Sequence, residues 1–238
     1  ISNKDNKVFE DFEYFYPTSV METGYDILPF WVIRMLMLGI YATKTVPFKD
    51  IVLHGLVRDA SGEKISKSKG NVINPIEMSE KYGSDALRMG LLWGTLIEND
   101  ISLSEDNIRG QRNFSNKIWN IARFMKIVFE ENGKIPFYPE KSRGKLAKED
   151  KEILLKLKKL IVSSSKKIDK YRLSEAAESI YKFIRNDFAD KYLEGIKGRK
   201  DKNIALSIFR YVFLTSLKLL HPFMPFVTEA VWEELKDF

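Results

Sequence analysis

The feature that most constrains the fold is a helical spacing of apolar residues that extends from Ser104 almost to the end of the chain. Phe114, Ile118, Ile121 and Met125 recur at intervals of four and three, so they share one face of a helix. Three later stretches keep apolar residues at helical spacing: residues 153–168, 173–188 and 203–220. An antiparallel helix bundle is therefore predicted for this part of the chain.

The first 95 residues have a different pattern, with short apolar runs separated by turn signals. Phe12–Tyr16 and Val20–Thr23 are predicted as short extended segments. The mostly apolar stretch Ile27–Ile40 predicts a helix that is buried on most sides. Ile51–Val57 is an apolar run typical of a strand inside a parallel sheet. Together these segments predict an open α/β layer.

The predicted fold class is therefore α/β plus all-α. A partial Rossmann-like nucleotide-binding fold is expected in residues 1–95, and an antiparallel helix bundle in residues 96–238. Residues 132–147 contain two prolines and two glycines and are predicted to be a linker. Asn74-Pro75 predicts a helix start, and a last helix is expected from about Phe226.

Composition excludes several classes of protein. The chain has no cysteine and only two histidines, which excludes a disulfide framework, a thiolate zinc site and a histidine-rich metal site. No metal ligands are predicted. The longest apolar stretch contains Arg34 and is shorter than a membrane span, so no membrane partner is expected. The N-terminal sequence Ile-Ser-Asn-Lys-Asp is neither a start methionine nor a signal peptide, so a piece of a longer chain is expected.

The positive charge is concentrated in one segment. Residues 141–202 contain 19 Lys and Arg against 10 Asp and Glu, a net charge of +9, whereas the whole chain carries +6. Such a block indicates a polyanionic partner, with nucleic acid the first candidate. A solvated lysine-rich helical surface explains the same charge equally well.

The segment 64–71 (KISKSKGN) is the most informative for chemistry. Its three lysines and two serines follow a turn at 59–62. Hydroxyl groups and backbone amides can bind phosphate oxygens, and lysines neutralise their charge. An exposed basic turn is the alternative interpretation of this segment.

Two strand ends upstream of that segment carry glycine beside a polar residue. His54-Gly55 follows one apolar run, and Gly24 lies two residues before Asp26 at the end of another. Ligands of open α/β sheets bind at the carboxyl ends of strands, where glycine permits close approach. The three segments together indicate one nucleotide site. The alternatives are a helix N-cap for Asp26 and a buried, hydrogen-bonded side chain for His54.

On these residues the chain resembles the C-terminal part of the class I aminoacyl-tRNA synthetases. The segment Lys64–Ser68 is similar to their KMSKS signature, with Ile65 in place of the usual methionine. Within the family, the segment TGYDILPFW (23–31) favours the valine-specific members over the isoleucine-specific ones. Further segments resemble the same members in the same order: FYPT (15–18), FWVIRM (30–35), LHGLVRD (53–59), GSDALR (83–88), RNFSNKIWN (112–120) and HPFMPF (221–226).

The resemblance implies an enzyme that activates valine with ATP and Mg2+ and transfers it to tRNA(Val) in the cytoplasm. Lys64 and Lys67 would stabilise the leaving pyrophosphate as catalytic cations, and Ser66 and Ser68 would shape the ATP-binding loop. No protein nucleophile is required, because positioning and charge stabilisation carry the reaction.

For the adenylate, the resemblance implies Gly24 and Asp26 at the ribose and His54, Gly55 and Leu56 along the adenine. Trp31 would form a wall of the amino acid pocket, and ordinary core packing is its alternative role.

The helical part resembles a stem-contact and anticodon-binding bundle, and 96–238 would be a truncated form of it. Six cations are candidate tRNA phosphate contacts, each with a solvated surface position as the alternative: Arg109, Arg112, Lys117, Arg123, Lys182 and Arg185.

The family's HIGH motif is absent from this sequence, and it is expected before Ile1 together with the editing domain. The chain alone is therefore expected to be inactive. Three alternatives remain open: an isoleucyl- or leucyl-type synthetase, a non-catalytic tRNA-binding module derived from a synthetase, and a structural or nucleotide-binding protein unrelated to translation.

Overall fold

The structure is a computed structural model that describes residues 6–59, 61–63, 65, 73–95, 99–133, 146–199 and 201–236. Packing divides the chain into two compact units. The first comprises Ile1–Arg58 and Leu96–Ile101, and the second comprises Asp59–Thr95 and Ser102–Phe238. The domain bounds 1–95 and 96–238 stay a prediction.

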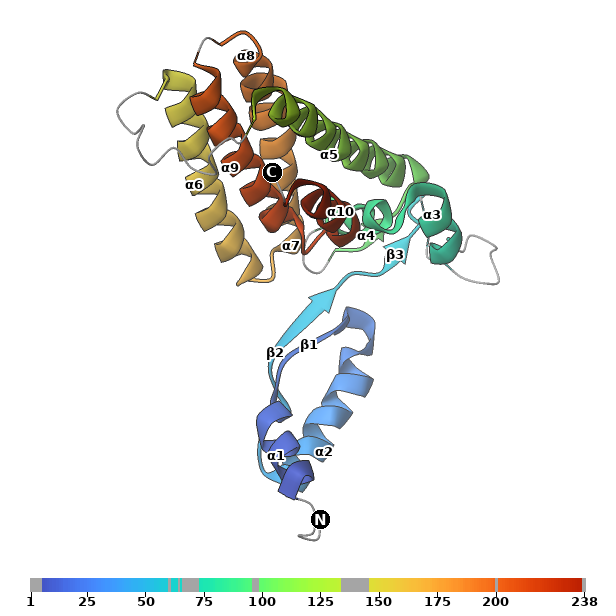
Figure 1. Cartoon of the computed structure of the whole chain (residues 1–238). Coiled ribbons are helices and arrows are strands. Elements are labelled where there is room, and N and C mark those ends of the chain that lie inside the picture. The colour runs from blue at the N-terminus through green and yellow to red at the C-terminus, as the bar shows by residue number, and fades with distance from the viewer. Residues whose placement is uncertain are drawn as a thin grey trace. The chain divides into compact units, whose positions relative to one another are not determined.

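The first unit is built on two parallel strands, β1 (Thr18–Gly24) and β2 (Phe48–His54), shown in Figure 1. Their register places Thr18 opposite Phe48 and Gly24 opposite His54, so both strands end at the same edge. A helical segment joins them, as a parallel pair requires a crossover. Its parts are η1 (Tyr25–Ile27), the π-helical η2 (Leu28–Val32) and α2 (Ile33–Thr43).

Two expectations for this unit need correction. Phe12–Tyr16 is not extended, because α1 (Asn6–Phe15) includes most of it. The rings of Phe12 and Tyr16, four residues apart, stack at 4.8 Å, a side-chain pairing that the helical repeat produces. The expected helix Ile27–Ile40 is present, but the expectation that it is buried on most sides is wrong. Its side chains are largely exposed within the described residues, with Met37 at 67 % and only Val32 buried.

Short elements begin the second unit and lead into its longest helix. Asn74 caps α3 (Pro75–Tyr82) by accepting a hydrogen bond from Ile76 N at 3.0 Å, which confirms the predicted helix start. α4 (Ser84–Leu92) follows, and then α5 (Glu105–Asn132), capped by Ser104. The two-residue strands β3 (Val57–Arg58) and β4 (Ile101–Ser102) pair with one another, and all of their residues except Ser102 belong to the first unit.

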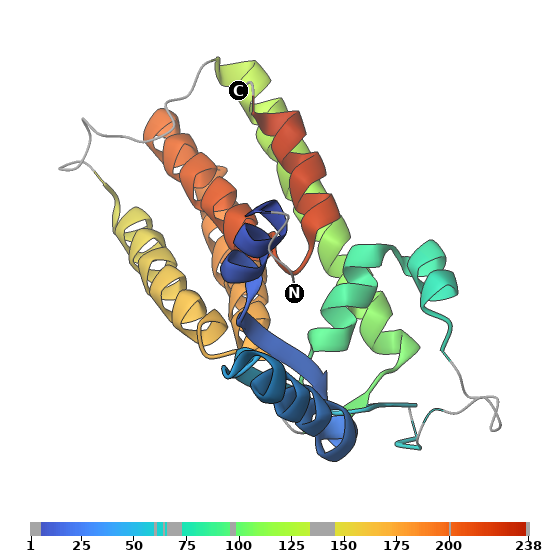
Figure 2. The ribbon, with the colours of Figure 1, turned by 90° about the horizontal axis from the view of Figure 1, so that it is seen from below.

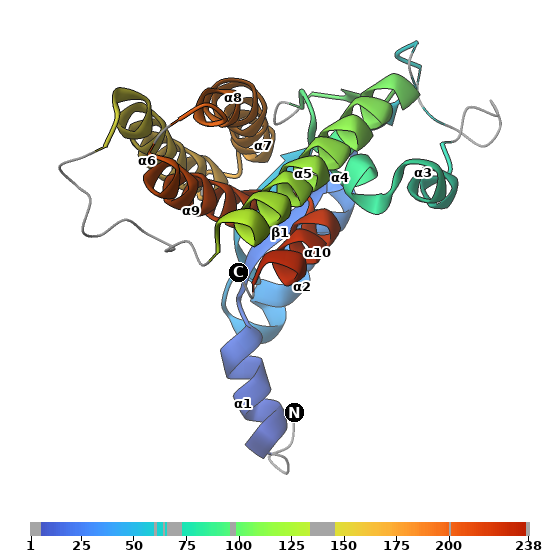
Figure 3. The same ribbon diagram turned by 45° about the horizontal axis from the view of Figure 1, so that its top comes forward.

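The rest of the second unit is a helix bundle, seen in Figure 3. α10 runs beside α5, as Figure 2 shows. The bundle confirms the predicted fold class, and its helices have the following bounds: α6 (Lys148–Ile168), α7 (Leu173–Lys182), η5 (Phe183–Leu193), α8 (Glu194–Ile196), α9 (Lys202–Leu220) and α10 (Pro225–Leu235).

The hydrophobic core lies around α9, whose buried residues occupy more than one face of the helix. The fully buried rings of Phe188, Phe209 and Phe213 stack nearly parallel, with centroids 5.3–6.3 Å apart. Aromatic rings of this size dominate the energetics of a core because each buries a large apolar area. The bundle therefore has a well-packed centre that can hold its surface residues in fixed positions.

Two 19-residue helical segments are long and apolar enough to pass a membrane-span test by length and composition alone. They are Tyr25–Thr43 and Lys202–Leu220. The second is the bundle's core helix α9, which explains its apolar character. The first contains Asp26 and Arg34, and it is weak evidence for a membrane partner.

Candidate functional site

The parallel register of β1 and β2 gathers four of the predicted nucleotide residues at one sheet edge. Gly24 ends β1 and His54 ends β2 as direct register partners. A Cβ atom at position 24 would lie 2.9 Å from Asp26 Oδ1, 3.5 Å from Leu56 Cδ2 and 3.7 Å from His54 Cε1. Because Gly24 has no side chain, a space remains that Asp26, Leu56 and His54 border. This space lies at the strand ends, where ligands of such sheets bind.

The carboxylate of Asp26 is not used as a helix cap. Asp26 lies within η1, and no described residue forms a hydrogen bond or ion pair with its side chain. The side chain is exposed, so its oxygens can accept hydrogen bonds from a ligand. The N-cap alternative is therefore not supported, whereas a ribose contact remains a prediction.

His54 is held in place by two contacts that involve different ring nitrogens. Nδ1 donates to the carbonyl oxygen of Gly55 at 2.8 Å, and Nε2 lies 3.2 Å from Glu22 Oε1 on the neighbouring strand. The His54 side chain is 47 % exposed, so it is not the buried histidine that was the alternative. The ring is thus fixed at the sheet edge while one side remains open to solvent.

Gly55 and the chain that passes over it form the tightest part of this edge. A Cβ atom at Gly55 would lie 1.8 Å from the carbonyl oxygen of Asn99. Asp100 then accepts from Leu56 N at 2.8 Å and pairs with the Arg58 guanidinium. The Leu56 amide and Arg58 together hold the pKa of the Asp100 carboxyl below its usual value.

Sequence reasoning missed Glu22, Asn99 and Asp100. The only available signal was the glycine at position 55, which indicates a close approach without saying which segment approaches. Asn99 and Asp100 lie more than forty residues away in sequence, so local patterns do not identify them.

Trp31 lies in η2 and is 55 % exposed, so ordinary core packing does not explain it within the described residues. Its role in an amino acid pocket remains a prediction.

The turn predicted at 59–62 is confirmed: Asp59 Oδ1 accepts from Ser61 N at 3.0 Å and from Glu63 N at 2.8 Å. Four predicted loop residues lie outside the described residues: Lys64, Ser66, Lys67 and Ser68.

The four predicted RNA-contacting cations of α5 have different surroundings. Arg109 pairs with Asp106 at 2.6 Å, and Lys117 pairs with Asp190 at 2.5 Å. Arg112 donates to the carbonyl oxygen of Tyr82 at 3.2 Å, which ties α5 to the end of α3. Arg123 is exposed, and no described residue contacts its charge.

The two cations beyond α5 also differ. Lys182 pairs with Glu178 at 3.0 Å, one helical turn away. Arg185 lies in η5 with its guanidinium 5.7 Å from the centre of the Tyr181 ring. Lys117 and Arg185 line the same cavity beside α5, so the structure brings these two predicted residues together. The other four do not line it.

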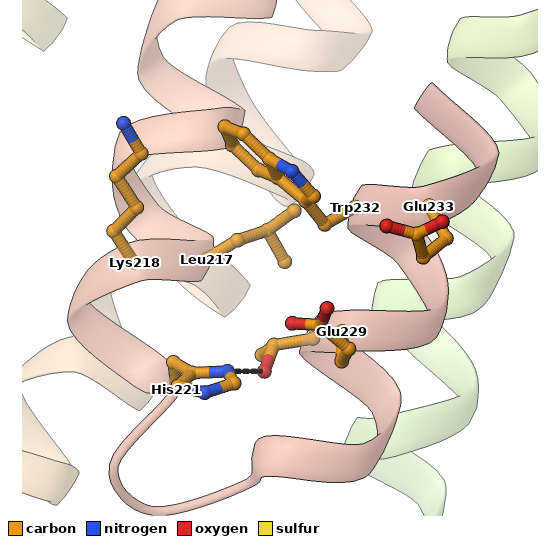
Figure 4. Close-up of a pocket in the computed structure, with 7 residues that line it drawn as sticks. Leu217, Lys218, His221, Glu229, Trp232 and Glu233 are labelled. Atoms are coloured by element: carbon orange, nitrogen blue, oxygen red, sulfur yellow. Dashed lines mark hydrogen bonds between the residues drawn. The ribbon is translucent and has the colours of Figure 1, made fainter. Parts of the chain in front are cut away.

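A cavity between α9 and α10, of about 310 Å3, lies beside the His-Pro break (Figure 4). His221 Nδ1 and Thr228 Oγ1 are 2.8 Å apart, and Lys218 Nζ lies 5.1 Å from the Trp232 ring centre. Since Thr228 Oγ1 donates to the carbonyl oxygen of Met224, the histidine Nδ1 is the donor in their contact. This bond links the two ends of the turn between α9 and α10, so His221 has a structural role.

Comparisons with known protein families find one match in the N-terminal part of the chain and another in the helix bundle. Residues 2–104 match the family described as tRNA synthetases class I (I, L, M and V), and residues 150–237 match the anticodon-binding domain of tRNA ligase. The chain therefore contains a class I tRNA synthetase domain followed by an anticodon-binding domain.

Curated relatives of the chain include valine--tRNA ligases. That of Nitratidesulfovibrio vulgaris is 46 % identical over 231 residues, and that of Clostridium tetani is 40 % identical over 234 residues. The matches cover 95 % and 96 % of this chain. The chain spans about a quarter of the length of each relative, since 26 % of either protein is matched.

Solved structures share the fold at lower sequence identity. Mycobacterium tuberculosis methionyl-tRNA synthetase, in complex with methionyl-adenylate, matches with a TM-score of 0.76 and 22 % identity over 93 % of this chain and 45 % of its own. The LeuRS of Agrobacterium radiobacter K84, in a ternary complex with tRNA and LeuAMS, matches with a TM-score of 0.76 and 20 % identity over 92 % of this chain and 27 % of its own.

Proposed function

We propose that this chain is the part of a valine--tRNA ligase that completes the ATP site and carries the tRNA-binding bundle. In the first step, a carboxylate oxygen of valine attacks the α-phosphorus of ATP, and pyrophosphate leaves. In the second step, a hydroxyl of the terminal tRNA adenosine attacks the activated carbonyl carbon, and AMP leaves. Mg2+ enters with ATP as part of the substrate.

The observation that carries this proposal is the gathering of Gly24, Asp26, His54 and Leu56 at the ends of two parallel strands. The Asp26 carboxylate accepts hydrogen bonds from the ribose hydroxyls, and the glycine allows the ribose to approach the backbone. His54, Gly55 and Leu56 lie along the adenine. The identity of more than 40 % to a valine--tRNA ligase supports valine as the amino acid, with Trp31 as a wall of its pocket.

The lysines of the segment 64–71 supply the positive charge that the phosphates of ATP require. Lys67 contacts the phosphates and stabilises the negative charge that develops on pyrophosphate, and Lys64 adds to the field. Ser66 and Ser68 shape the loop. The turn built on Asp59 is the described feature that precedes this loop.

The bundle is proposed to hold tRNA(Val) in the cytoplasm. Along α5, the side chains of Asn113, Asn116 and Asn120 border cavities beside Lys117, and amides can contact base edges while lysines contact phosphates. The bounds 1–95 for the nucleotide part and 96–238 for the tRNA part belong to this proposal.

The test is valine-dependent ATP–pyrophosphate exchange by the full-length protein that contains this chain. Exchange is expected with valine and much less with isoleucine or leucine. Asp26→Ala should reduce it, whereas Lys44→Ala, at an exposed residue just after the end of α2, should not. Exchange that prefers isoleucine or leucine would reassign the amino acid. No exchange with any amino acid, together with retained tRNA binding, would favour the non-catalytic module.

A further inference from the structure

A second cavity in the bundle unit, the α5 cavity, has a volume of about 390 Å3. It lies between Trp93 at the end of α4, the Asp106–Lys117 part of α5, Tyr181 of α7 and Arg185 of η5. Pockets that bind small molecules typically have volumes of about 300–1,000 Å3. The α5 cavity is therefore large enough for a ligand, and the family's nucleotide site at the strand ends does not account for it.

One buried polar atom beside this cavity has no partner. The Gln111 side chain lines the cavity and is 4 % exposed, and no described group donates a hydrogen bond to its Oε1 atom. Its Nε2 donates to Asn107 Oδ1 at 3.4 Å. A buried acceptor without a donor is costly, because it has lost water without gaining a bond. A ligand that supplies an N–H donor would satisfy it.

Aromatic rings form one wall of the α5 cavity. The rings of Trp93 and Tyr181 meet edge to face with centroids 4.7 Å apart, and those of Phe114 and Tyr181 lie 4.4 Å apart. All three line the cavity. Aromatic surfaces in such positions bind flat ring systems, and unstacked nucleobases are the common ring ligand of proteins that bind RNA single strands.

The charges that line the cavity leave one cation uncompensated. Asp106 pairs with Arg109 at 2.6 Å and Lys117 pairs with Asp190 at 2.5 Å. Arg185 donates to Tyr181 Oη and lies over its ring, and no described carboxylate pairs with it. A guanidinium in this situation favours an anionic ligand, and phosphate matches its fork of donors.

We propose that the α5 cavity binds one nucleotide unit of an RNA strand. The base stacks against the aromatic wall and donates an N–H to Gln111 Oε1, while the phosphate lies at Arg185. Asn113, whose amide has no hydrogen-bond partner among the described residues, contacts a second base edge atom. The inference rests on the proposed function only for the source of the nucleotide, which is tRNA.

The test uses the 238-residue chain labelled with 15N, titrated with AMP, CMP, GMP and UMP, with ribose 5-phosphate and with single-stranded RNA trinucleotides. Saturable shifts are expected for the Trp93 indole N–H and the Gln111 side-chain amide. Ribose 5-phosphate, which lacks a base, should bind at least about tenfold more weakly. A trinucleotide should bind more tightly than a mononucleotide. Equal affinities would overturn RNA as the source in favour of a free nucleotide.

Two variants locate the bound nucleotide. Gln111→Leu removes the unpaired acceptor and should weaken binding about tenfold, and Arg185→Gln should do the same by removing the cation. Lys49→Gln removes one exposed charge in the first unit and serves as the control, with unchanged affinity. Arg185 is exposed, so its variant tests the site even if Gln111→Leu perturbs the core.

Two results would overturn the inference. One is the absence of any saturable shift with the wild-type chain, which would make the cavity water-filled only. The other is wild-type affinity in both variants, which would place the nucleotide elsewhere. ATP–pyrophosphate exchange uses neither Gln111 nor Arg185, so failure here and failure of the proposed function are separate results.

Discussion

Gly55, just after the end of β2, is a position where no residue with a side chain fits unless the backbone moves. Its neighbour Asn99 approaches so closely that even a methyl group would overlap the Asn99 carbonyl oxygen, at 1.8 Å. The same approach lets Asp100 accept from the Leu56 amide, which fixes the backbone that is proposed to lie along adenine. A single glycine thus sets the geometry of both segments.

Gly55→Ala is expected to destabilise the chain by about 1–3 kcal/mol, because an added methyl in a packed site forces the backbone to move. The measurement is the free energy of unfolding in urea. Gly195→Ala is the control, since a Cβ there meets nothing within 4 Å and the position is helical. It should stabilise by up to about 1 kcal/mol. Equal effects of the two changes would contradict the close approach.

Lys67→Ala in the full-length protein is expected to slow valine-dependent ATP–pyrophosphate exchange about 100- to 1000-fold, or about 3–4 kcal/mol. The reason is that the lysine meets charge that grows on the leaving pyrophosphate, whereas valine binding should change little. Lys67→Arg should restore part of the rate, because a planar guanidinium does not replace a compact ammonium. Near-normal exchange by Lys67→Ala would contradict this role and would favour the alternative that Lys67 belongs to an exposed basic turn.

At the scale of elements, a buried ion pair joins the start of α6 to the chain after α8. Asp150 is fully buried and accepts from both terminal nitrogens of Arg199, at 2.5 and 2.8 Å. Tyr192 donates to the same carboxylate at 2.8 Å, and burial with this bond raises the pKa of Tyr192. The carboxylate is thus compensated on every side, which makes the loss of one partner costly.

Arg199→Met is expected to lower the free energy of unfolding by about 3–5 kcal/mol, because it leaves the Asp150 carboxylate buried and unpaired. The double variant Asp150→Leu/Arg199→Met should be more stable than the single one. Arg172→Met breaks the exposed pair with Glu175 and should cost less than about 1 kcal/mol. Chemical denaturation checks the order of the three variants, and a loss after Arg199→Met no larger than after Arg172→Met would refute it.

The helices of the bundle could be predicted from sequence because their apolar spacing persists over many residues. The Phe12–Tyr16 segment could not, since its aromatic residues favour strands locally and only the stacked rings of Phe12 in α1 and Tyr16 just after it show the helical preference. For the stretch 27–40, the sequence predicts the helix correctly but not its exposure. Apolar spacing shows which residues are apolar, but it does not show whether another part of the protein covers them. The strand-end glycines were found by pattern, whereas Asn99 and Asp100 required the fold.

For the whole molecule, the excess of +9 in residues 141–202 is expected to make tRNA binding strongly dependent on salt. Counterion release makes affinity fall by about 1000-fold between 50 and 200 mM salt when about six phosphates are contacted. Binding of tRNA to the 238-residue chain over that range is the measurement. Lys158→Gln with Lys159→Gln should reduce the slope, and Lys49→Gln should not. Salt-independent binding would exclude the block as the contact surface.

The first unit exposes several large apolar side chains. Phe30, Met37 and Leu38 are 67–68 % exposed on one helical segment, which is more than scattered surface residues explain. The chain should therefore bind a hydrophobic dye and self-associate. Met37→Lys with Leu38→Lys should reduce both effects, while Leu155→Lys, at an exposed apolar residue of α6, should not. Light scattering and dye fluorescence measure the two effects, and a monomeric chain without dye binding would contradict the exposed surface.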